Sequence, residues 1–140
     1  MKNAPKDFQP IPTGLGFTDT LQPFYGKFNE EHARFGFYVE EKHCNPAGIC
    51  HGGALMTFLD IAFGGVIMNK FEEFKALPTI NMNTDFVALG VKGDWLESEI
   101  TFLHMTKTMA FIGGEIRSAN GPVVRANGSF RLPKDATFKK

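Results

Sequence analysis

The hydrophobic and polar positions divide the chain into one segment that is almost entirely apolar and several segments in which apolar and polar residues alternate. A helix over residues 54–68 would have almost no polar face, and the one charged residue of this segment is Asp60. A helix that is apolar all round has to be buried all round. We therefore predict a central helix here, wrapped by a sheet and covered on its remaining side by another subunit. The segment is too short to span a bilayer comfortably.

Alternation with a period of two predicts strands on both sides of this helix. Before it, Phe35, Phe37 and Val39 alternate within residues 34–43, and a short helix is expected around residues 21–29. The predicted strands after the central helix are 79–87, 94–105, 108–118 and 123–132, with a hairpin signal at Asn120-Gly121. This order predicts an α+β domain, with one helix against a curved antiparallel sheet whose last four strands form a meander.

Length and charge narrow the class of protein. The 140 residues suit one domain, which we divide into an N-terminal arm over 1–30, a domain over 31–133 and a tail over 134–140. Lys+Arg and Asp+Glu both number 15, so no basic excess favours nucleic acid, and a neutral chain does little to repel its own copies. The polar, proline-rich N-terminus lacks the apolar run of a signal peptide, so we expect a cytoplasmic protein without a membrane partner.

The loop before the central helix ends in two glycines, Gly52 and Gly53. Glycine lets the backbone come close to a ligand, and the first amides of a helix have no internal partner at its partly positive end. A carbonyl oxygen that gains negative charge would be stabilised there, and the Gly52 amide is the natural donor. The alternative is a tight turn that uses glycine for its geometry alone.

Asp60 is the second candidate. A carboxylate in so apolar a helix is costly to bury unless it is paired or takes part in chemistry. It acts as a general base or positions water, or else a lysine, an arginine or a backbone amide satisfies it structurally. Asp60 follows Gly52 by eight residues, or about 12 Å of helix, so one carbonyl cannot easily touch both. Two antiparallel copies of the helix would bring Gly52 of one near Asp60 of the other.

Two cysteines, Cys44 and Cys50, lie beside His43 and His51 in the same loop. Their spacing differs from the two to four residues that usually separate zinc-binding cysteines, and a disulfide is not expected in a reducing compartment. A metal site and a cysteine nucleophile are the alternatives to two free thiols in or near a packed loop. We expect no metal and no cofactor.

Asn45, separated from Gly52-Gly53 by six residues, completes a pattern with His51 and with Asp60 eight residues after Gly52. This pattern resembles the motif of the hotdog thioesterases of the phenylacetate-pathway and four-hydroxybenzoyl-CoA types, over residues 36–132. The resemblance implies the hotdog fold, in which a long helix is wrapped by a curved antiparallel sheet. It also implies dimers that pair through sheet and helix, with two active sites built from both chains.

The resemblance further implies an acyl-CoA thioesterase that works as a homodimer or homotetramer. Asn45 and the Gly52 amide would polarise the thioester carbonyl, the partner's Asp60 would activate water or attack, and Thr79 would help to hold that water. His51 would brace the turn or neighbour the leaving thiol. The other residues implied to contact substrate or CoA are Gly53, Asn81, Phe86, Val87, Ala88, Leu89, Gly90, Lys107 and Thr108. The acyl group would lie against Phe58, Phe63 or Phe86, unless these are plain core.

Two other functions remain open. A dehydratase of the same fold would place an aspartate and a histidine close together, but no histidine follows Asp60 until His104. A non-catalytic acyl-CoA-binding or sensing protein would have no need of a carboxylate in the apolar helix. The acyl group, the choice between CoA and acyl carrier protein, and the choice between dimer and tetramer stay open.

Overall fold

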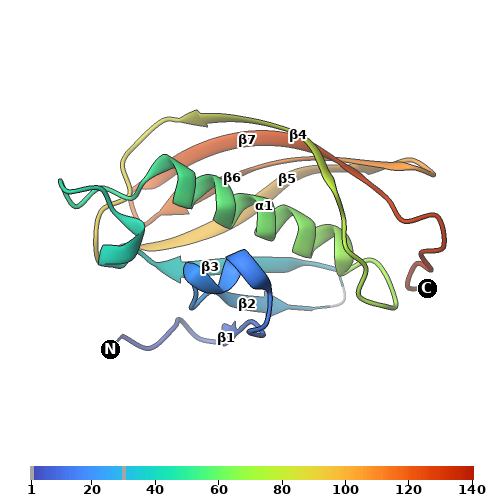
Figure 1. Cartoon of the computed structure of the whole chain (residues 1–140), viewed down its shortest axis with the longest axis horizontal. Helices are drawn as coiled ribbons and strands as arrows, with labels where there is room; N and C mark the ends of the chain where they lie inside the picture. Colours follow the sequence, from blue (N-terminus) through green and yellow to red (C-terminus); the bar gives the residue numbers. More distant parts are fainter. Residues whose placement is uncertain (1, 30) are drawn as a thin grey trace.

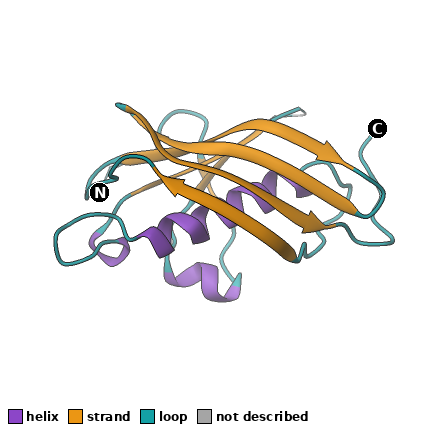
Figure 2. Ribbon diagram, turned by 90° about the horizontal axis from the view of Figure 1, so that it is seen from above, coloured by secondary structure: helices purple, strands orange, loops and turns teal. Residues whose placement is uncertain are grey.

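One long helix, α1 (Gly52–Met68), lies against one face of a curved, seven-stranded antiparallel sheet in the computed structural model of the chain (Figures 1 and 2). The structure describes residues 2–29 and 31–140. The strands are β1 (Gln9–Pro10), β2 (Tyr25–Phe28), β3 (Ala33–Tyr38), β4 (Thr79–Phe86), β5 (Trp95–Met105), β6 (Met109–Ser118) and β7 (Gly121–Arg131). Two short 3₁₀ helices, η1 (Gly16–Thr20) and η2 (Glu41–His43), complete the described elements.

The predicted α+β class and the central helix are confirmed, and so are the strands expected after it to within two or three residues at each end. The Asn120-Gly121 signal is also confirmed, since β6 and β7 form a hairpin that pairs Ser118 with Gly121. The short helix expected over residues 21–29 is wrong, because β2 occupies this stretch and pairs with β3. Phe24 and Gly26 alternate as buried positions there, which is the pattern of a strand and not of a helix.

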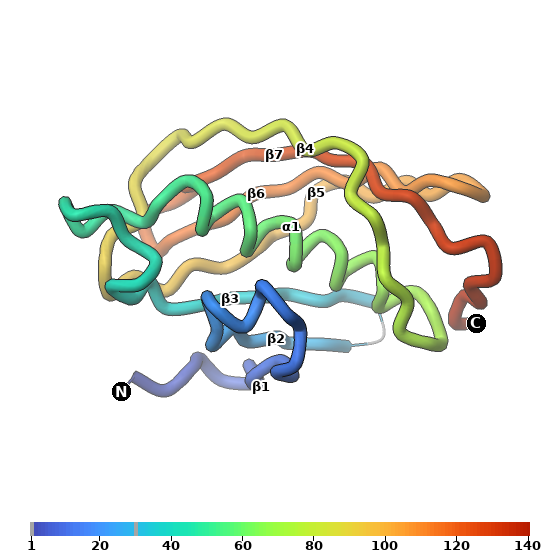
Figure 3. The backbone as a smooth tube through the Cα atoms, viewed as in Figure 1, coloured from blue at the N-terminus to red at the C-terminus, as the bar shows by residue number. Residues whose placement is uncertain are grey.

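The predicted four-stranded meander is also wrong, because the sheet order is β1-β2-β3-β5-β6-β7-β4. Figure 3 shows the chain leaving the end of α1, passing to β4 at one edge of the sheet and returning to β5 in its middle. β4 therefore pairs with β7, from Thr79 opposite Phe130 to Phe86 opposite Val124. Period-two alternation locates strands but does not name their neighbours, and a crossover between β4 and β5 leaves no signal in it.

Phenylalanine builds much of the core between sheet and helix. Phe24, Phe37, Phe58, Phe63 and Phe130 are at most 1% exposed. The ring of Phe58 lies 4.6 Å from that of Phe37 and 5.3 Å from that of Phe24, measured between centroids. Phe58 and Phe63 are therefore core residues, whereas Phe86 is half exposed at the end of β4.

Residues 1–30, expected as an arm, contribute β1 and β2 to the sheet, although Met1 and Glu30 lie outside the described residues. The segment between these strands turns back over the helix side of the molecule and forms η1 (Figure 1). No helix among the described residues is long and apolar enough to cross a membrane.

Candidate functional site

A buried histidine fixes the loop that leads into α1. His43 is 1% exposed. Its Nδ1 accepts the Glu40 N–H at 2.9 Å, and its Nε2 donates to the Leu21 carbonyl at 2.7 Å. Burial lowers the pKa of His43 below its ordinary value of 6.5, and the Leu21 carbonyl opposes this shift only in part. His43 is therefore a neutral structural residue, and its own carbonyl accepts the His51 N–H at 2.7 Å.

Asn45 stands exposed in this loop with its side-chain oxygen already occupied. Its Oδ1 accepts the backbone N–H of Ala47 at 3.0 Å and that of Ile49 at 3.2 Å. Only the oxygen of an amide can accept, so these two bonds fix which way the group points. The Asn45 NH₂ group makes no hydrogen bond to the described residues and can donate to a ligand.

The first turn of α1 is held by a ring and shaped by glycine. His51 is the N-cap, and its Nδ1 accepts the Gly53 N–H at 2.9 Å, which leaves the ring proton on Nε2. Neither Gly52 nor Gly53 has a positive φ, so the turn itself does not demand glycine. Space favours glycine at both positions, since a Cβ would lie 3.2 Å from the Phe86 ring at Gly52 and 3.1 Å from the His51 ring at Gly53, and each ring would have to shift by a few tenths of an ångström.

Asp60 is half-buried on α1 and pairs with Thr79 at the start of β4. The Thr79 hydroxyl donates to Asp60 Oδ1 at 2.6 Å. Among residues 2–29 and 31–140, no lysine or arginine forms an ion pair with this carboxylate, and no backbone N–H donates a hydrogen bond to it. Its second oxygen therefore remains able to accept a further hydrogen bond, and a purely structural explanation of Asp60 loses its expected partners.

Asp60 and Thr79 border an apolar pocket of about 410 Å³. Leu15 of the N-terminal segment, Ile61 and Met68 of α1, and Phe74 and Leu77 of the loop after α1 form much of its wall. Sequence reasoning did not find this pocket, because three segments far apart in the chain meet only in the folded structure. The one signal in the sequence was the number of phenylalanines, 15, which is compatible with an apolar groove as well as with a large core.

The predicted site residues form two separate groups, one at the N-terminal end of α1 and one farther along the helix. At the N-terminal end, the Phe86 ring covers Gly52, and Gly90 accepts the Cys50 N–H at 2.8 Å. Residues 86–90 are thus brought beside Asn45, His51 and Gly52, and Val87, Ala88 and Leu89 are exposed. Asn81 also lies exposed on β4, where its side chain accepts from Asn83.

Lys107 and Thr108 lie at the opposite end, in the turn between β5 and β6. The Thr108 carbonyl accepts the Leu132 N–H at 2.9 Å, and the neighbouring Arg131 N–H donates to the Pro78 carbonyl at 3.0 Å. Through β7, this turn is linked to the start of β4 at Pro78, with that one strand between them. One chain does not bring the predicted carbonyl-polarising residues and the predicted base together.

Cys50, one of the two cysteines of this loop, is unsuited to nucleophilic chemistry. Cys44 and Cys50 are free thiols. Burial, with Cys44 close by, raises the pKa of Cys50 to about 12, so Cys50 carries no thiolate at neutral pH. In the described part of the chain, no three His, Cys, Asp or Glu side chains are grouped so that they could hold a metal ion.

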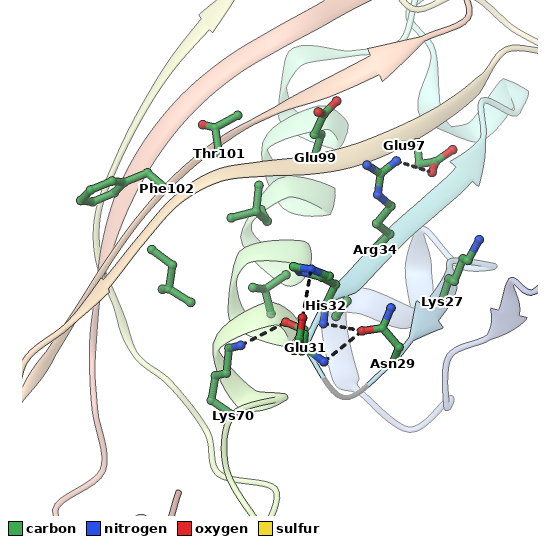
Figure 4. A pocket seen from close by; sticks show the side chains of 14 residues that line it. Lys27, Asn29, Glu31, His32, Arg34, Lys70, Glu97, Glu99, Thr101 and Phe102 are labelled. Atoms are coloured by element: carbon green, nitrogen blue, oxygen red, sulfur yellow. Dashed lines mark hydrogen bonds and ion pairs between the residues drawn. The ribbon is translucent and has the colours of Figure 1, made fainter. Parts of the chain in front are cut away.

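A larger and more polar pocket of about 670 Å³ lies between β3 and β5 (Figure 4). The two strands pair only from Gly36 opposite Glu97 to Tyr38 opposite Trp95, and they separate beyond that point. Arg34 and Glu97 form an ion pair of 3.2 Å across the opening. None of the residues predicted from the sequence to act on substrate lines this pocket.

The chain is similar in sequence and in fold to known proteins. Residues 47–125 match the model of the thioesterase superfamily. The chain is 31% identical to a Pseudomonas aeruginosa protein named "Putative esterase PA0474", over 95% of this chain and 100% of that protein. Two solved structures share the fold. They are a mutant of a Thermus thermophilus phenylacetic acid degradation protein (TM-score 0.71, 18% identity, 84% of this chain and 98% of that one) and a Streptococcus pneumoniae hypothetical thioesterase with coenzyme A (TM-score 0.68, 20% identity, 88% and 92%).

Proposed function

The chain belongs to the thioesterase superfamily and has its hotdog fold, and from this premise we propose that it hydrolyses acyl-CoA thioesters as a homodimer. The products are free CoA and a carboxylic acid. The coenzyme A in the Streptococcus pneumoniae structure supports CoA as the thiol carrier. The observation that carries the proposal is the Asp60–Thr79 pair at the border of an apolar pocket.

Asp60 acts as a general base in this mechanism. The Thr79 hydroxyl holds Oδ1 and leaves Oδ2 to take a proton from water. The water oxygen adds to the thioester carbon, and the Asn45 NH₂ and the Gly52 N–H donate to the oxygen that becomes negative. When the intermediate collapses, the C–S bond breaks and the proton held by Asp60 goes to the departing sulfur.

The distance between these groups supports a site that is built from two chains. Gly52 and Asp60 are eight residues apart on α1, which is about 12 Å along the helix axis. A two-fold axis that sets two α1 helices antiparallel brings the partner's Asp60 to Gly52, and it does so twice. The same operation brings the partner's Lys107 and Thr108 toward residues 86–90, where a positive charge can meet a phosphate of CoA.

The edge strand β4 supports this dimer. No other strand lies beside its outer edge in the described part of the chain, so its backbone groups are free to pair with a second β4. Ile80, Phe86, Val87 and Leu89, on β4 and just after it, are each at least 50% exposed. On α1, Met56 is also exposed, so the helix is not covered by its own sheet on every side. Exposed apolar side chains beside an unpaired strand edge favour pairing with another chain.

The test is release of free thiol from acyl-CoA by the wild type, by Asp60→Asn and by the control Asp135→Asn. Asparagine keeps the shape of Asp60 and accepts from Thr79, but it cannot take a proton. We expect kcat to fall by roughly 10²–10⁴-fold for Asp60→Asn, the range of general-base catalysis. Asp135 is an exposed carboxylate of the C-terminal tail that pairs with Lys75 at 3.5 Å and with no other cation of the described residues, so its substitution should change kcat little.

Two outcomes would contradict the proposal. Hydrolysis by Asp60→Asn at the wild-type rate would remove Asp60 from the mechanism. Tight binding of acyl-CoA without turnover by the wild type, across short, long and aromatic acyl groups, would favour a binding or sensing protein instead.

A further inference from the structure

Two adjacent glycines of α1, Gly64 and Gly65, have different reasons to be glycine. A Cβ on Gly65 would lie 2.3 Å from the ring of Phe35, so packing forbids a side chain there. A Cβ on Gly64 would meet no heavy atom within 4 Å beyond its neighbours and its own helix, although Gly64 is buried. Glycine inside a helix destabilises it relative to alanine, and neither packing within the described part of the chain nor backbone conformation accounts for that cost at Gly64.

The space above Gly64 is the pocket beside Asp60. Asp60, Ile61, Gly64 and Met68 all line this pocket, and their spacing places them along one face of α1. From Asp60 to Met68 the helix rises by about 12 Å, with Gly64 halfway along. The missing side chain of Gly64 keeps the pocket continuous between its two ends.

The chemistry of the pocket walls matches a hydrocarbon. Leu15, Phe74 and Leu77 face α1 across the pocket. Apart from Asp60 and Thr79 at the border, Thr18 is the only lining residue with a hydrogen-bonding side chain, so a polar substituent far from the thioester would find few partners. Two Asp19 contacts hold the N-terminal wall in place, since its carboxylate accepts the Gly14 N–H at 2.8 Å and the Leu15 N–H at 3.2 Å.

We propose that this pocket binds an unbranched alkyl acyl group of medium length, and that Gly64 is the residue that sets the accepted length. The inference rests on the proposed function and names its substrate class. An extended backbone advances about 3.3–3.6 Å over three bonds, so an alkyl chain covers 12 Å in roughly ten bonds. Roughly ten bonds join about eleven carbons, so acyl groups of about ten carbons come close to filling the pocket from Asp60 to Met68.

The test compares kcat/KM for the acyl-CoA series from acetyl to dodecanoyl, with benzoyl and phenylacetyl included, in three proteins. The wild type should prefer octanoyl and decanoyl over acetyl. Gly64→Leu should block the pocket halfway and lower the ratio of octanoyl to butanoyl turnover by at least about tenfold, a typical discrimination by pocket shape. Met68→Trp should block the far end and reduce decanoyl turnover relative to hexanoyl.

The outcomes separate this inference from the proposed function. Equal losses at every chain length in both variants, or a wild type that prefers acetyl or the aromatic groups, would overturn the chain-length inference and leave the thioesterase intact. No thiol release from any acyl-CoA by the wild type would overturn the proposed function and the substrate class with it. If Gly64→Leu does not fold, Met68→Trp and Gly64→Ala, which adds a single methyl group, still decide the question.

Discussion

The two halves of α1 differ in almost every chemical respect. The N-terminal half begins in a polar loop, presents amide donors at Asn45 and Gly52, and is fixed by two histidine rings. The C-terminal half carries the carboxylate of Asp60, the hydroxyl of its partner Thr79 and an apolar pocket. In the proposed mechanism, the N-terminal half supplies the donors without a base, and the C-terminal half supplies the base without donors. This difference is the reason why the proposed mechanism uses two copies of the chain.

The largest effect beyond that of Asp60→Asn is expected in the N-terminal half. Asn45→Asp keeps a side-chain oxygen for the Ala47 and Ile49 amides, removes the NH₂ donor and puts a negatively charged oxygen in its place. Loss of one such donor typically costs roughly 10²–10³-fold in kcat, and steady-state thiol release measures it. An unchanged melting temperature together with unchanged kcat would show that Asn45 only shapes the loop.

A smaller effect is expected in the C-terminal half from Thr79→Val, which is nearly isosteric and cannot donate to Asp60. We expect kcat to fall by about tenfold, since a hydrogen bond to a charged group is worth about 1.5–3 kcal/mol and water replaces part of it. Thr79→Ser restores the hydroxyl and should recover most of the rate. Equal kcat values for the valine and serine variants would mean that the hydroxyl does not assist Asp60.

The sequence allowed some features of these two halves of α1 to be predicted and not others. Gly52 and Asp60 were predicted as candidates because their residue types are unusual in their surroundings, and Asn45 was predicted from the resemblance to the hotdog thioesterases. The length of helix between Gly52 and Asp60 follows from their spacing. The direct Thr79–Asp60 bond, the pocket and the role of His43 depend on contacts between segments far apart in the chain, which periodicity does not encode. The edge position of β4 escaped prediction for the same reason, since alternation in Thr79–Phe86 is equally compatible with a central strand.

The pH dependence of stability should reside in the N-terminal half. The unfolded chain protonates His43 near its ordinary pKa of 6.5, but the folded chain holds it neutral because burial lowers this pKa. As the pH falls below about 6.5, the unfolded state takes up a proton that the folded state does not, so the free energy of unfolding decreases. This contribution has a slope of at most about 1.4 kcal/mol per pH unit.

Urea unfolding between pH 5 and pH 8 measures this slope in the wild type, His43→Gln and the exposed-histidine control His32→Gln. The control should keep the slope and His43→Gln should lose it. Identical slopes in all three proteins would place the pH dependence elsewhere.

The smallest effects distinguish the two glycines of the C-terminal half. Gly64→Ala adds a methyl group in open space and should raise the free energy of unfolding by about 0.5–1 kcal/mol. Gly65→Ala should lower it, because its Cβ would collide with the Phe35 ring. Thermal unfolding of the two variants gives the comparison, and a loss of stability in both would mean that the space above Gly64 is not open.

The central claim is that each active site takes its donors from one chain and its base from the other, and subunit mixing tests it most directly. Asp60→Asn and Asn45→Asp are unfolded together in equal amounts, refolded and assayed for thiol release. Random pairing across a two-fold axis makes half of the dimers mixed, and one of the two sites in each mixed dimer is intact. The account predicts recovery of about one quarter of wild-type activity from two nearly inactive proteins. Activity no higher than that of either variant alone would contradict it and place the whole site within a single chain.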